Sequence, residues 1–365
     1  MNVKNWIFAL SVAVLLGSCI QDEALNTEAD IETVELKEGD VLIREAVINN
    51  DNVKLPVKDE QDITKLTPIL TLTPGATVEP PSGTTRDFTT PQTYTVTSED
   101  GQWKKTYTVS VVYSGIPLSY HFDKFTPVKN SKGETVYYNF FESDDTGNYM
   151  DWTNANAGFE YTGVKAAPED YPTAPADGGY GGGKCIKLTT KSTGSLGALL
   201  KMYLAAGNLF MGSFKISLPH VVKATKFGIP FKHVPHKITG YYKYKAGPVF
   251  TQGGKEVPGK KDIFDIYGIF YETDEQVTTL DGTNQFTSPN LISVARISDA
   301  RETDQWTRFE IPFEMKPGKT VDMKKLKDGK YNFALVFSSS IRGDYFEGAE
   351  GSTLYIDEVN VDIEY

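Results

Sequence analysis

The sequence has no run of about twenty apolar residues, the length that an α-helix needs to cross a bilayer. It also has no dense cluster of lysine and arginine, and its net charge is -11. Binding to nucleic acid or to a polybasic lipid site would need clustered cations that neutralise phosphate. The composition therefore argues against nucleic acid as a partner and favours a chain kept soluble in an extracellular setting.

Common catalytic motifs are scarce as well. No Gly-x-Ser-x-Gly elbow, phosphate loop or dinucleotide fingerprint follows a predicted strand. Of the four histidines, His233 and His236 are close in sequence, but Pro235 excludes the helical face of a zinc protease. The segment Gly178–Gly183 is rich in glycine, yet neither Lys-Ser/Thr nor a helical pattern follows it. We expect a mobile loop there.

The N-terminal region carries a short apolar segment of about ten residues, Trp6–Leu16, which follows Lys4 and ends in Gly17-Ser18-Cys19. Charge, length and the small residue before the cysteine are typical of a secretory signal. The cleavage site resembles the lipobox of bacterial lipoproteins, in which the cysteine is diacylated and becomes the mature N-terminus. We therefore expect a signal peptide over residues 1–18, lipidation of Cys19, and a flexible tether over residues 19–30.

An acidic pair, Asp22-Glu23, lies just behind this cysteine. It resembles the export signal that carries Bacteroidetes lipoproteins to the outer face of the outer membrane. The expected location is thus the bacterial outer membrane, with a lipid anchor as the membrane contact and the protein facing the exterior. If the lipid occupies Cys19, Cys185 remains alone and no intramolecular disulfide can form. Cys185 is expected to be structural, because no sequence neighbour supplies a base.

Residues 31–114 consist of short strand patterns rich in Thr, Val and Tyr. Strands are predicted at 69–73, 94–97 and 107–112, and Asp100-Gly101 is a strong hairpin signal. This pattern predicts an immunoglobulin-like β-sandwich. The segment Thr77–Gly101 resembles the N-terminal Ig-like modules of Bacteroidetes surface lipoproteins, which are usually spacers.

Residues 115–365 also favour strands, so the predicted fold class is all-β throughout. Alternation at Phe309/Ile311/Phe313 and Phe333/Leu335/Phe337 indicates half-buried strands, and Phe264–Tyr271 is apolar on both faces, as in a central strand. Only 196–206 and 321–326 suggest short helices. Many strands with long glycine-rich loops predict a single antiparallel jelly-roll.

Several motifs of this second region, in order, resemble the putative carbohydrate metabolism domain of Bacteroidetes: Trp152–Asn156, Ala205–Phe210 with Gly212–Phe214, Gly228–Phe231, Gly240–Tyr244 and Gly343–Val359. The resemblance covers roughly Tyr120 to Tyr365. It implies a galactose-binding-like jelly-roll in proteins associated with glycan use. The resemblance does not identify any catalytic residue in this chain.

Sugar binding needs an aromatic plate for the CH face of a pyranose and polar groups for its hydroxyls. Candidates for these parts are Trp152, Tyr242, Tyr244, Arg342 and Tyr345. The alternative for Trp152 and for each tyrosine is a place in the core. The predicted function is polysaccharide binding at the cell surface without catalysis. The sequence leaves open whether the protein works alone or beside outer-membrane glycan-import components.

Two other functions stay open. A glycoside hydrolase needs two carboxylates about 5 to 10 Å apart, and the candidates are Asp265 and Glu272, which a strand can hold rigidly. A structural adhesin or pilus-type subunit would need an exposed edge strand or a donor strand.

Asp357 lies at the same alternating position as Val359 and Val361, which predicts a carboxylate facing the core. Such a group needs a partner. Jelly-roll carbohydrate-binding modules often place a structural calcium there, with oxygens from the first and last strands, and Asp123 is the matching early acid. The alternative is a hydrogen bond to the backbone or to arginine, with no metal and no other cofactor.

Overall fold

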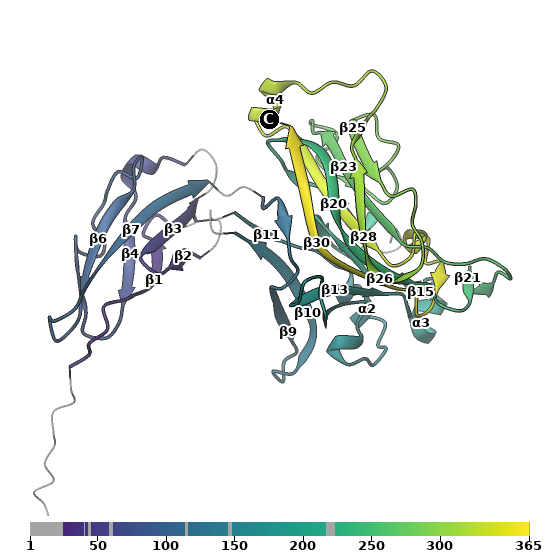
Figure 1. Ribbon diagram of the computed structural model, residues 1–365, viewed down its shortest axis with the longest axis horizontal. Helices are drawn as coiled ribbons and strands as arrows, with labels where there is room; N and C mark the ends of the chain where they lie inside the picture. Colours follow the sequence, from purple (N-terminus) through teal and green to yellow (C-terminus); the bar gives the residue numbers. More distant parts are fainter. Residues whose placement is uncertain are drawn as a thin grey trace, which may run out of the picture. The chain divides into compact units, whose positions relative to one another are not determined.

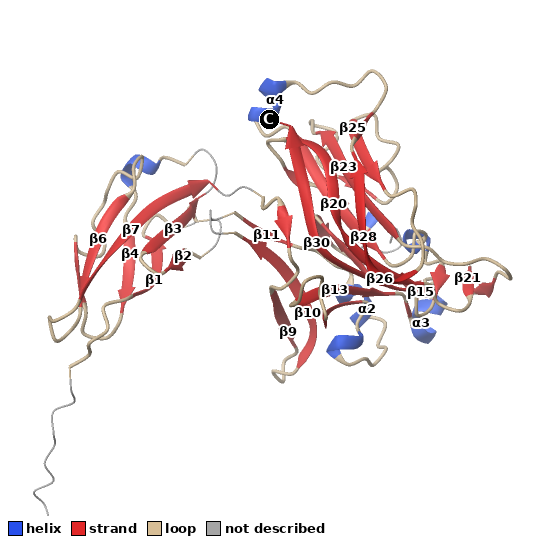
Figure 2. Ribbon diagram, viewed as in Figure 1, coloured by secondary structure: helices blue, strands red, loops and turns tan. Residues whose placement is uncertain are grey.

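The computed structural model describes residues 25–39, 41–42, 45–57, 61–113, 116–144, 148–216 and 223–364. The chain divides into two compact units, residues 1–114 and residues 115–365. Strands dominate both units, as Figure 2 shows, which confirms the predicted all-β class. The predicted signal peptide, Cys19 and the first part of the tether lie outside the described residues.

The N-terminal unit is an immunoglobulin-like sandwich of two sheets. One sheet pairs β1 (Ile31–Leu36) with β4 (Pro68–Leu72). The other has the order β2-β3-β7-β6-β5, in which β3 and β7 run parallel. Its strands are β2 (Val47–Asn49), β3 (Asn52–Val57), β5 (Thr77–Glu79), β6 (Gln92–Thr97) and β7 (Lys104–Tyr113). A 3-10 turn, η1 (Ile63–Lys65), precedes β4.

Alternation decides which side chains enter this first core. Tyr94 and Val96 of β6, and Tyr107 and Val109 of β7, are buried, as their period of two predicts. The predicted hairpin connects β6 and β7, and Gly101 adopts a positive φ of 70° in its turn.

The C-terminal unit is a jelly-roll built around two large antiparallel sheets (Figure 1). The first sheet has the order β12-β13-β30-β20-β26, and β8 also pairs with β30. Its strands are β8 (Ser119–Tyr120), β12 (Thr173–Asp177), β13 (Lys184–Thr189), β20 (Val234–Lys245), β26 (Thr303–Pro312) and β30 (Thr353–Glu364).

The second sheet has the order β16-β28-β23-β25-β27, with β19 also paired to β28. Its strands are β16 (Asn208–Phe210), β19 (Ile229–Pro230), β23 (Asp265–Glu272), β25 (Leu291–Arg296), β27 (Glu314–Met315) and β28 (Tyr331–Ser338). β23 lies between β28 and β25, so the strand that is apolar on both faces is central, as predicted.

Smaller elements surround these sheets. A three-stranded sheet contains β9 (Phe125–Lys129), β10 (Thr135–Ser143) and β11 (Tyr149–Asp151). Further short strands are β14 (Lys191–Ser192), β15 (Leu204–Ala205), β17 (Gly212–Phe214), β18 (Thr225–Phe227), β21 (Phe250–Gln252), β22 (Lys255–Glu256), β24 (Leu280–Asp281) and β29 (Gly348–Ala349). The helices are α2 (Asn156–Glu160), α3 (Gly194–Leu199) and α4 (Met323–Lys327), with 3-10 turns η2 (Pro168–Asp170) and η4 (Gly343–Tyr345). α3 begins two residues before the predicted helix 196–206 and ends at Leu199, and α4 is displaced toward the C-terminus relative to the predicted helix 321–326. α2 was not predicted.

The core of the jelly-roll fills the space between the inner faces of its two large sheets. Ile238 and Ile356 of the first sheet, and Ile266 and Phe337 of the second, are fully buried in one continuous cluster. A Cβ on Gly268 of β23 would meet Phe313 and Ile238 at 2.5 and 2.8 Å, so the two sheets approach closely there.

One irregularity in β30 changes the face on which Asp357 lies. The pairing with β20 shifts by one residue between Thr239/Asn360 and Tyr241/Asp357, and Glu358 has a φ of 49°. This β-bulge places Asp357 opposite Tyr241 on the outer face, whereas Val359 and Val361 remain inside. The prediction that Asp357 faces the core with the two valines is therefore wrong.

Candidate functional site

A cavity of the C-terminal unit with a volume of about 1040 Å³ lies on the outer face of the second sheet. Its floor consists of alternate residues of three neighbouring strands, Tyr267 of β23, Val336 of β28 and Phe210 of β16. These positions alternate with core residues such as Ile266, Phe337 and Leu209. The walls come from α2, α3, β17, β18 and the segments 282–287 and 340–346.

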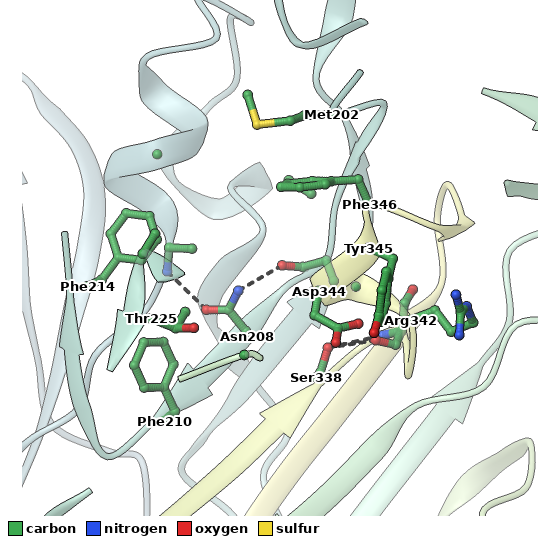
Figure 3. Close-up of a pocket in the computed structure, with 18 of the residues that line it drawn as sticks. Met202, Asn208, Phe210, Phe214, Thr225, Ser338, Arg342, Asp344, Tyr345 and Phe346 are labelled. Carbon is green, nitrogen blue, oxygen red and sulfur yellow. Dashed lines mark hydrogen bonds between the residues drawn. The ribbon is translucent and has the colours of Figure 1, made fainter. Parts of the chain in front are cut away.

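Aromatic rings line much of this cavity. Figure 3 shows Phe210 and Phe214 on one side and Tyr345 with Phe346 on the other. The Phe210 ring packs edge-on against Phe227, with 5.3 Å between centroids, which fixes its orientation. Tyr345 is 57% exposed, so its ring remains available to a ligand. A cavity of this size with several rings could hold more than one sugar unit.

Asp344 contributes the unusual polar group of the cavity. It belongs to η4, which follows β28, and its Oδ1 is buried without a hydrogen-bond partner among the described residues. Burial raises the pKa of Asp344 from 3.8 to about 6, although Arg342 and Arg296 oppose this shift. A carboxyl group with a pKa near 6 can hold a proton close to neutral pH and donate it.

Arg342 and Tyr345 flank Asp344 in sequence and line the same cavity. The Arg342 guanidinium lies 4.5 Å from the centroid of the Tyr345 ring, and its Nε donates to a Glu347 carboxylate oxygen. These two contacts hold both side chains at the cavity mouth. Arg342 and Tyr345 thus lie where a glycan could reach them, and their role in binding stays a prediction.

A second carboxylate, Asp265, also lines the cavity but is already paired. Arg296 donates from Nε and Nη2 to its two oxygens, at 3.1 and 2.7 Å. Burial raises the pKa of Asp265, and the bonds from Arg296 oppose that shift. The Arg296 guanidinium in turn lies 4.4 Å from the centre of the Phe286 ring. This arrangement fixes the carboxylate at the floor of the cavity.

Asp265 and Glu272 cannot act as a catalytic pair. They lie at the two ends of β23, and seven residues of strand span about 23 Å. Glu272 instead accepts hydrogen bonds from Lys325 of α4 and, at 3.3 Å, from the Tyr331 hydroxyl. The sequence prediction of this pair is wrong because strand rigidity holds the two groups apart.

Three of the predicted sugar-binding rings lie in the core. Trp152 is 3% exposed, and its ring packs against Tyr120, Phe122 and Phe337 with centroid distances of 5.2 to 5.8 Å. Tyr242 and Tyr244 are each 2% exposed, and both pack 4.8 Å from Phe264. They share one face of β20, as predicted, but that face is the inner one. None of the three rings can stack on a glycan in this structure.

Asp123 and Asp357 bind backbone N–H groups of one loop. Asp123 Oδ1 accepts from Lys184 N at 2.8 Å, and Asp357 Oδ2 accepts from Tyr180 N at 2.7 Å. Asp357 Oδ1 accepts from its neighbour Glu358 N at 2.9 Å. No cluster of three His, Cys, Asp or Glu suited to a metal occurs in the described residues. The observed bonds agree with the alternative of backbone partners, and a structural calcium at Asp123 and Asp357 stays a prediction.

The same bonds order the glycine-rich loop that we expected to be mobile. Residues 178–183 connect β12 to β13 and are held by Asp357 and the indole of Trp306, whose Nε1 donates to Gly178 O at 3.2 Å. Asp123 holds the first residue after this loop, Lys184. A Cβ on Gly179 would lie 2.5 Å from Asp357 Oδ2, so the close approach requires glycine.

Asp344 is the residue that sequence reasoning missed. It lies between Arg342 and Tyr345, both of which were selected, and it belongs to the long motif Gly343–Val359. Nothing in the local pattern distinguishes it from the other acids of the chain, because its burial depends on the folded surroundings, in which Arg296 is distant in sequence.

Comparison with known proteins identifies the family. The model of the putative carbohydrate metabolism domain matches residues 121–362, and the chain belongs to this family. The model described as SGBP, N-terminal, the N-terminal domain of surface glycan-binding proteins, matches residues 33–111. No curated protein matches the chain. Among the described residues, no helix is long and apolar enough to cross a membrane.

Two solved structures from Bacteroides are similar to this chain. One, from Bacteroides thetaiotaomicron, is described as a putative glycoside hydrolase; it is 51% identical, with 94% of this chain and 99% of that chain covered and a TM-score of 0.68. The other, from Bacteroides vulgatus and described in the same words, is 42% identical, with 69% of this chain and 100% of that chain covered and a TM-score of 0.65.

Proposed function

We propose that this chain is a surface glycan-binding protein whose C-terminal unit binds an oligosaccharide segment in the cavity beside Asp344. The observation that carries the proposal is the combination of exposed Tyr345, partly exposed Phe214 and the polar groups of Asp344 and Arg342 in one cavity of about 1040 Å³. Rings stack on the CH faces of sugars, and the polar groups bind hydroxyls. The membership of both units in carbohydrate-related families supports the same role.

Binding is tested with a panel of soluble polysaccharides in affinity gels and by calorimetry. Tyr345→Ala and Phe214→Ala should each weaken binding by about fivefold, since aromatic contacts contribute about 1 kcal/mol beyond burial. Trp103→Ala is the matched control, because Trp103 is 62% exposed in the N-terminal unit and is distant in sequence from the cavity residues. Equal losses in the control and the cavity variants would contradict the proposal.

A glycoside hydrolase is the second candidate function, and the raised pKa of Asp344 favours it. In that mechanism Asp344 donates a proton to the leaving oxygen, and Asp265, paired with Arg296, is the second carboxylate. Both side chains line the cavity, and the two Bacteroides relatives are described as putative glycoside hydrolases.

Reducing-sugar release separates the two functions. A hydrolase should lose turnover in Asp344→Asn and Asp265→Asn while still binding its substrate, and Glu272→Gln should remain active because it lies at the far end of β23. A protein that only binds should release no sugar in any form. Activity that survives both changes in the cavity would exclude these two residues as the catalytic pair.

We further propose that Cys19 carries a lipid that anchors the protein to the outer membrane, facing the exterior, where it could meet outer-membrane glycan-import components. Cys19→Ala should move the protein from the membrane fraction to the soluble fraction without changing its thermal unfolding. Retention of the variant in washed membranes would contradict the lipid anchor, and full protection from protease on whole cells would contradict the outward orientation.

A further inference from the structure

The outer face of the first sheet carries a row of partly exposed side chains that the cavity does not use. Lys187 of β13 pairs with Tyr355 of β30, and Tyr355 pairs with Lys243 of β20. Because directly paired residues point to the same side of a sheet, the Tyr355 ring lies between two lysines. These positions are on the opposite side of the sheet from Leu354, Ile356 and Tyr242, which face the core.

Trp306 of β26 extends this row. The Lys243 ammonium lies 4.4 Å from the centroid of the Trp306 ring and 5.1 Å from that of Tyr355. The hydrogen bond from Trp306 Nε1 to Gly178 O holds the indole in place. Lys243 is thus a cation held between two aromatic rings on an accessible face.

Tyr180, from the glycine-rich loop, adds another ring to the same face. It stacks on Tyr241, with 3.5 Å between centroids and 11° between planes, and it is 39% exposed. One side of the Tyr180 ring covers Tyr241, so the other side is open to solvent. The loop itself is held by Asp357, and Asp123 holds the residue that follows it, so this exposed ring is fixed before any ligand arrives.

Charges of both signs lie on this outer face, because Asp357 is paired with Tyr241 in the register of β20 and β30. Among the described residues, neither Lys187 nor Lys243 has a carboxylate within ion-pair distance, although the chain carries 48 acidic residues. Lys187 Nζ donates to the Glu169 backbone carbonyl, which does not neutralise it. Two unpaired cations beside fixed rings suit a ligand that is both ring-shaped and anionic.

We propose that this lysine–aromatic face, formed by Lys187, Lys243, Tyr180, Tyr241, Trp306 and Tyr355, binds an acidic polysaccharide. The rings stack on sugar faces, and the two ammonium groups bind carboxylate or sulfate substituents. The inference rests on the carbohydrate role proposed above, but the site lies on the other outer face of the sandwich and shares no residue with the cavity. The proposal specifies acidic polysaccharide as the ligand class, which the residues of the cavity do not indicate.

The test compares charged polymers with uncharged polymers of the same backbone. Dextran sulfate and polygalacturonate are the anionic probes, and dextran and methyl-esterified polygalacturonate are the neutral ones. The protein should bind at least one anionic probe at least tenfold more tightly than its neutral counterpart. The double variant Lys187→Ala/Lys243→Ala should lose about tenfold of that affinity or more, since hydrogen bonds between charged groups are the stronger kind.

Lys255→Ala is the matched control, because it removes one exposed cation from β22, outside this face. It should leave binding unchanged, and Tyr180→Ala or Trp306→Ala should weaken both anionic and neutral probes. Equal binding of charged and neutral polymers, or equal losses in Lys255→Ala and the double variant, would overturn the proposal.

Cavity variants distinguish this site from the one proposed above. If Tyr345→Ala abolishes binding of neutral glycans but leaves anionic binding intact, the two sites are separate and the face is supported. If Tyr345→Ala abolishes anionic binding while the lysine variant does not, the cavity holds that ligand and the face does not bind it.

Discussion

At the scale of single residues, Trp152 shows that the composition of a segment does not tell whether its aromatic ring binds a ligand or lies in the core. Its segment is rich in Asn and Asp, which suggested a polar loop. Yet Trp152 N donates to Phe140 O, and the ring is enclosed by Tyr120, Phe122 and Phe337. The residues that enclose the Trp152 ring are far apart in sequence, so the local sequence pattern cannot identify them. In contrast, Arg342 and Tyr345 do line the cavity, as residues of a long loop before a final strand can, and their role in glycan binding stays a prediction.

Trp152→Ala should therefore act on stability. Removing a large buried ring from a packed cluster typically lowers the free energy of unfolding by about 3 to 5 kcal/mol. Chemical denaturation of the variant measures this loss. Trp103→Ala, which removes an exposed indole, should change stability by no more than about 0.5 kcal/mol. A stable Trp152→Ala protein with weakened glycan binding would restore the original sequence prediction.

Asp344 makes stability depend on pH. Its pKa is about 6 in the folded protein against 3.8 for an ordinary aspartate. The folded state therefore holds the proton more tightly, so this group favours folding below about pH 4 and loses that contribution as the pH rises through 6. Asp344→Asn should be more stable than the wild type at pH 8 by up to about 2 kcal/mol, and the difference should disappear near pH 4.

Urea titrations of both proteins across this pH range check the sign. A variant less stable than the wild type at pH 8 would mean that the ionised carboxylate has a favourable partner in the folded state.

At the scale of elements, the sequence predicts which segments form strands better than it predicts how those strands pair and bend. The alternating residues of β6, β7 and β26 predicted both the strands and their buried faces. The strand β28 was predicted as half-buried, but it is buried on both faces because other segments cover its outer side. The bulge in β30 could not be predicted from the sequence. The extra residue depends on the pairing with the partner strand β20, and the hydrophobic pattern of β30 alone does not show it. That single irregularity reversed the predicted orientation of Asp357 and produced the anchor for the glycine-rich loop.

The glycine-rich loop should be sensitive to substitution at one position in particular. A Cβ at residue 179 would lie 2.3 Å from Lys184 O and 2.5 Å from Asp357 Oδ2, so the backbone must move. Gly179→Ala should lower the free energy of unfolding by about 1 to 3 kcal/mol, as overpacking usually does, and should weaken binding to the lysine–aromatic face.

Gly181→Ala is the comparison within the same loop. A Cβ there meets no atom within 4 Å, so only its φ of 79° opposes alanine, at a cost of about 1 kcal/mol. The denaturant midpoints of the two variants show which substitution lowers the stability more. A larger loss in Gly181→Ala would show that contacts to Asp357 do not limit this loop.

On the scale of the whole molecule, each unit has a core of its own. The buried cluster of the N-terminal unit uses residues between 29 and 109, and the large jelly-roll cluster uses residues between 120 and 361. A unit of about 250 residues buries roughly 70% of the surface of its unfolded chain, which is ample for an independent fold. The sequence prediction placed the boundary where Ser114-Gly115-Ile116-Pro117 interrupts the strand pattern.

A chain of residues 115–365 should therefore fold by itself. It should unfold in one cooperative transition at the same temperature as the corresponding transition of the full chain. Calorimetry of both proteins provides the measurement. A fragment that is insoluble or that melts much earlier would show that the N-terminal unit contributes to the stability of the jelly-roll.

The position of Cys185 allows the reaction of its thiol to measure the opening of the glycine-rich loop. Its side chain is fully buried, faces the same side of the sheet as Asp357, and has a pKa raised to about 12 by burial. A thiol reagent can react with it only when the glycine-rich loop and its surroundings open, so the labelling rate measures how often that opening occurs. Occupancy of the neighbouring face by a polymer would slow the reaction, and the loss of thiol signal over time could then follow binding without any added probe on the protein.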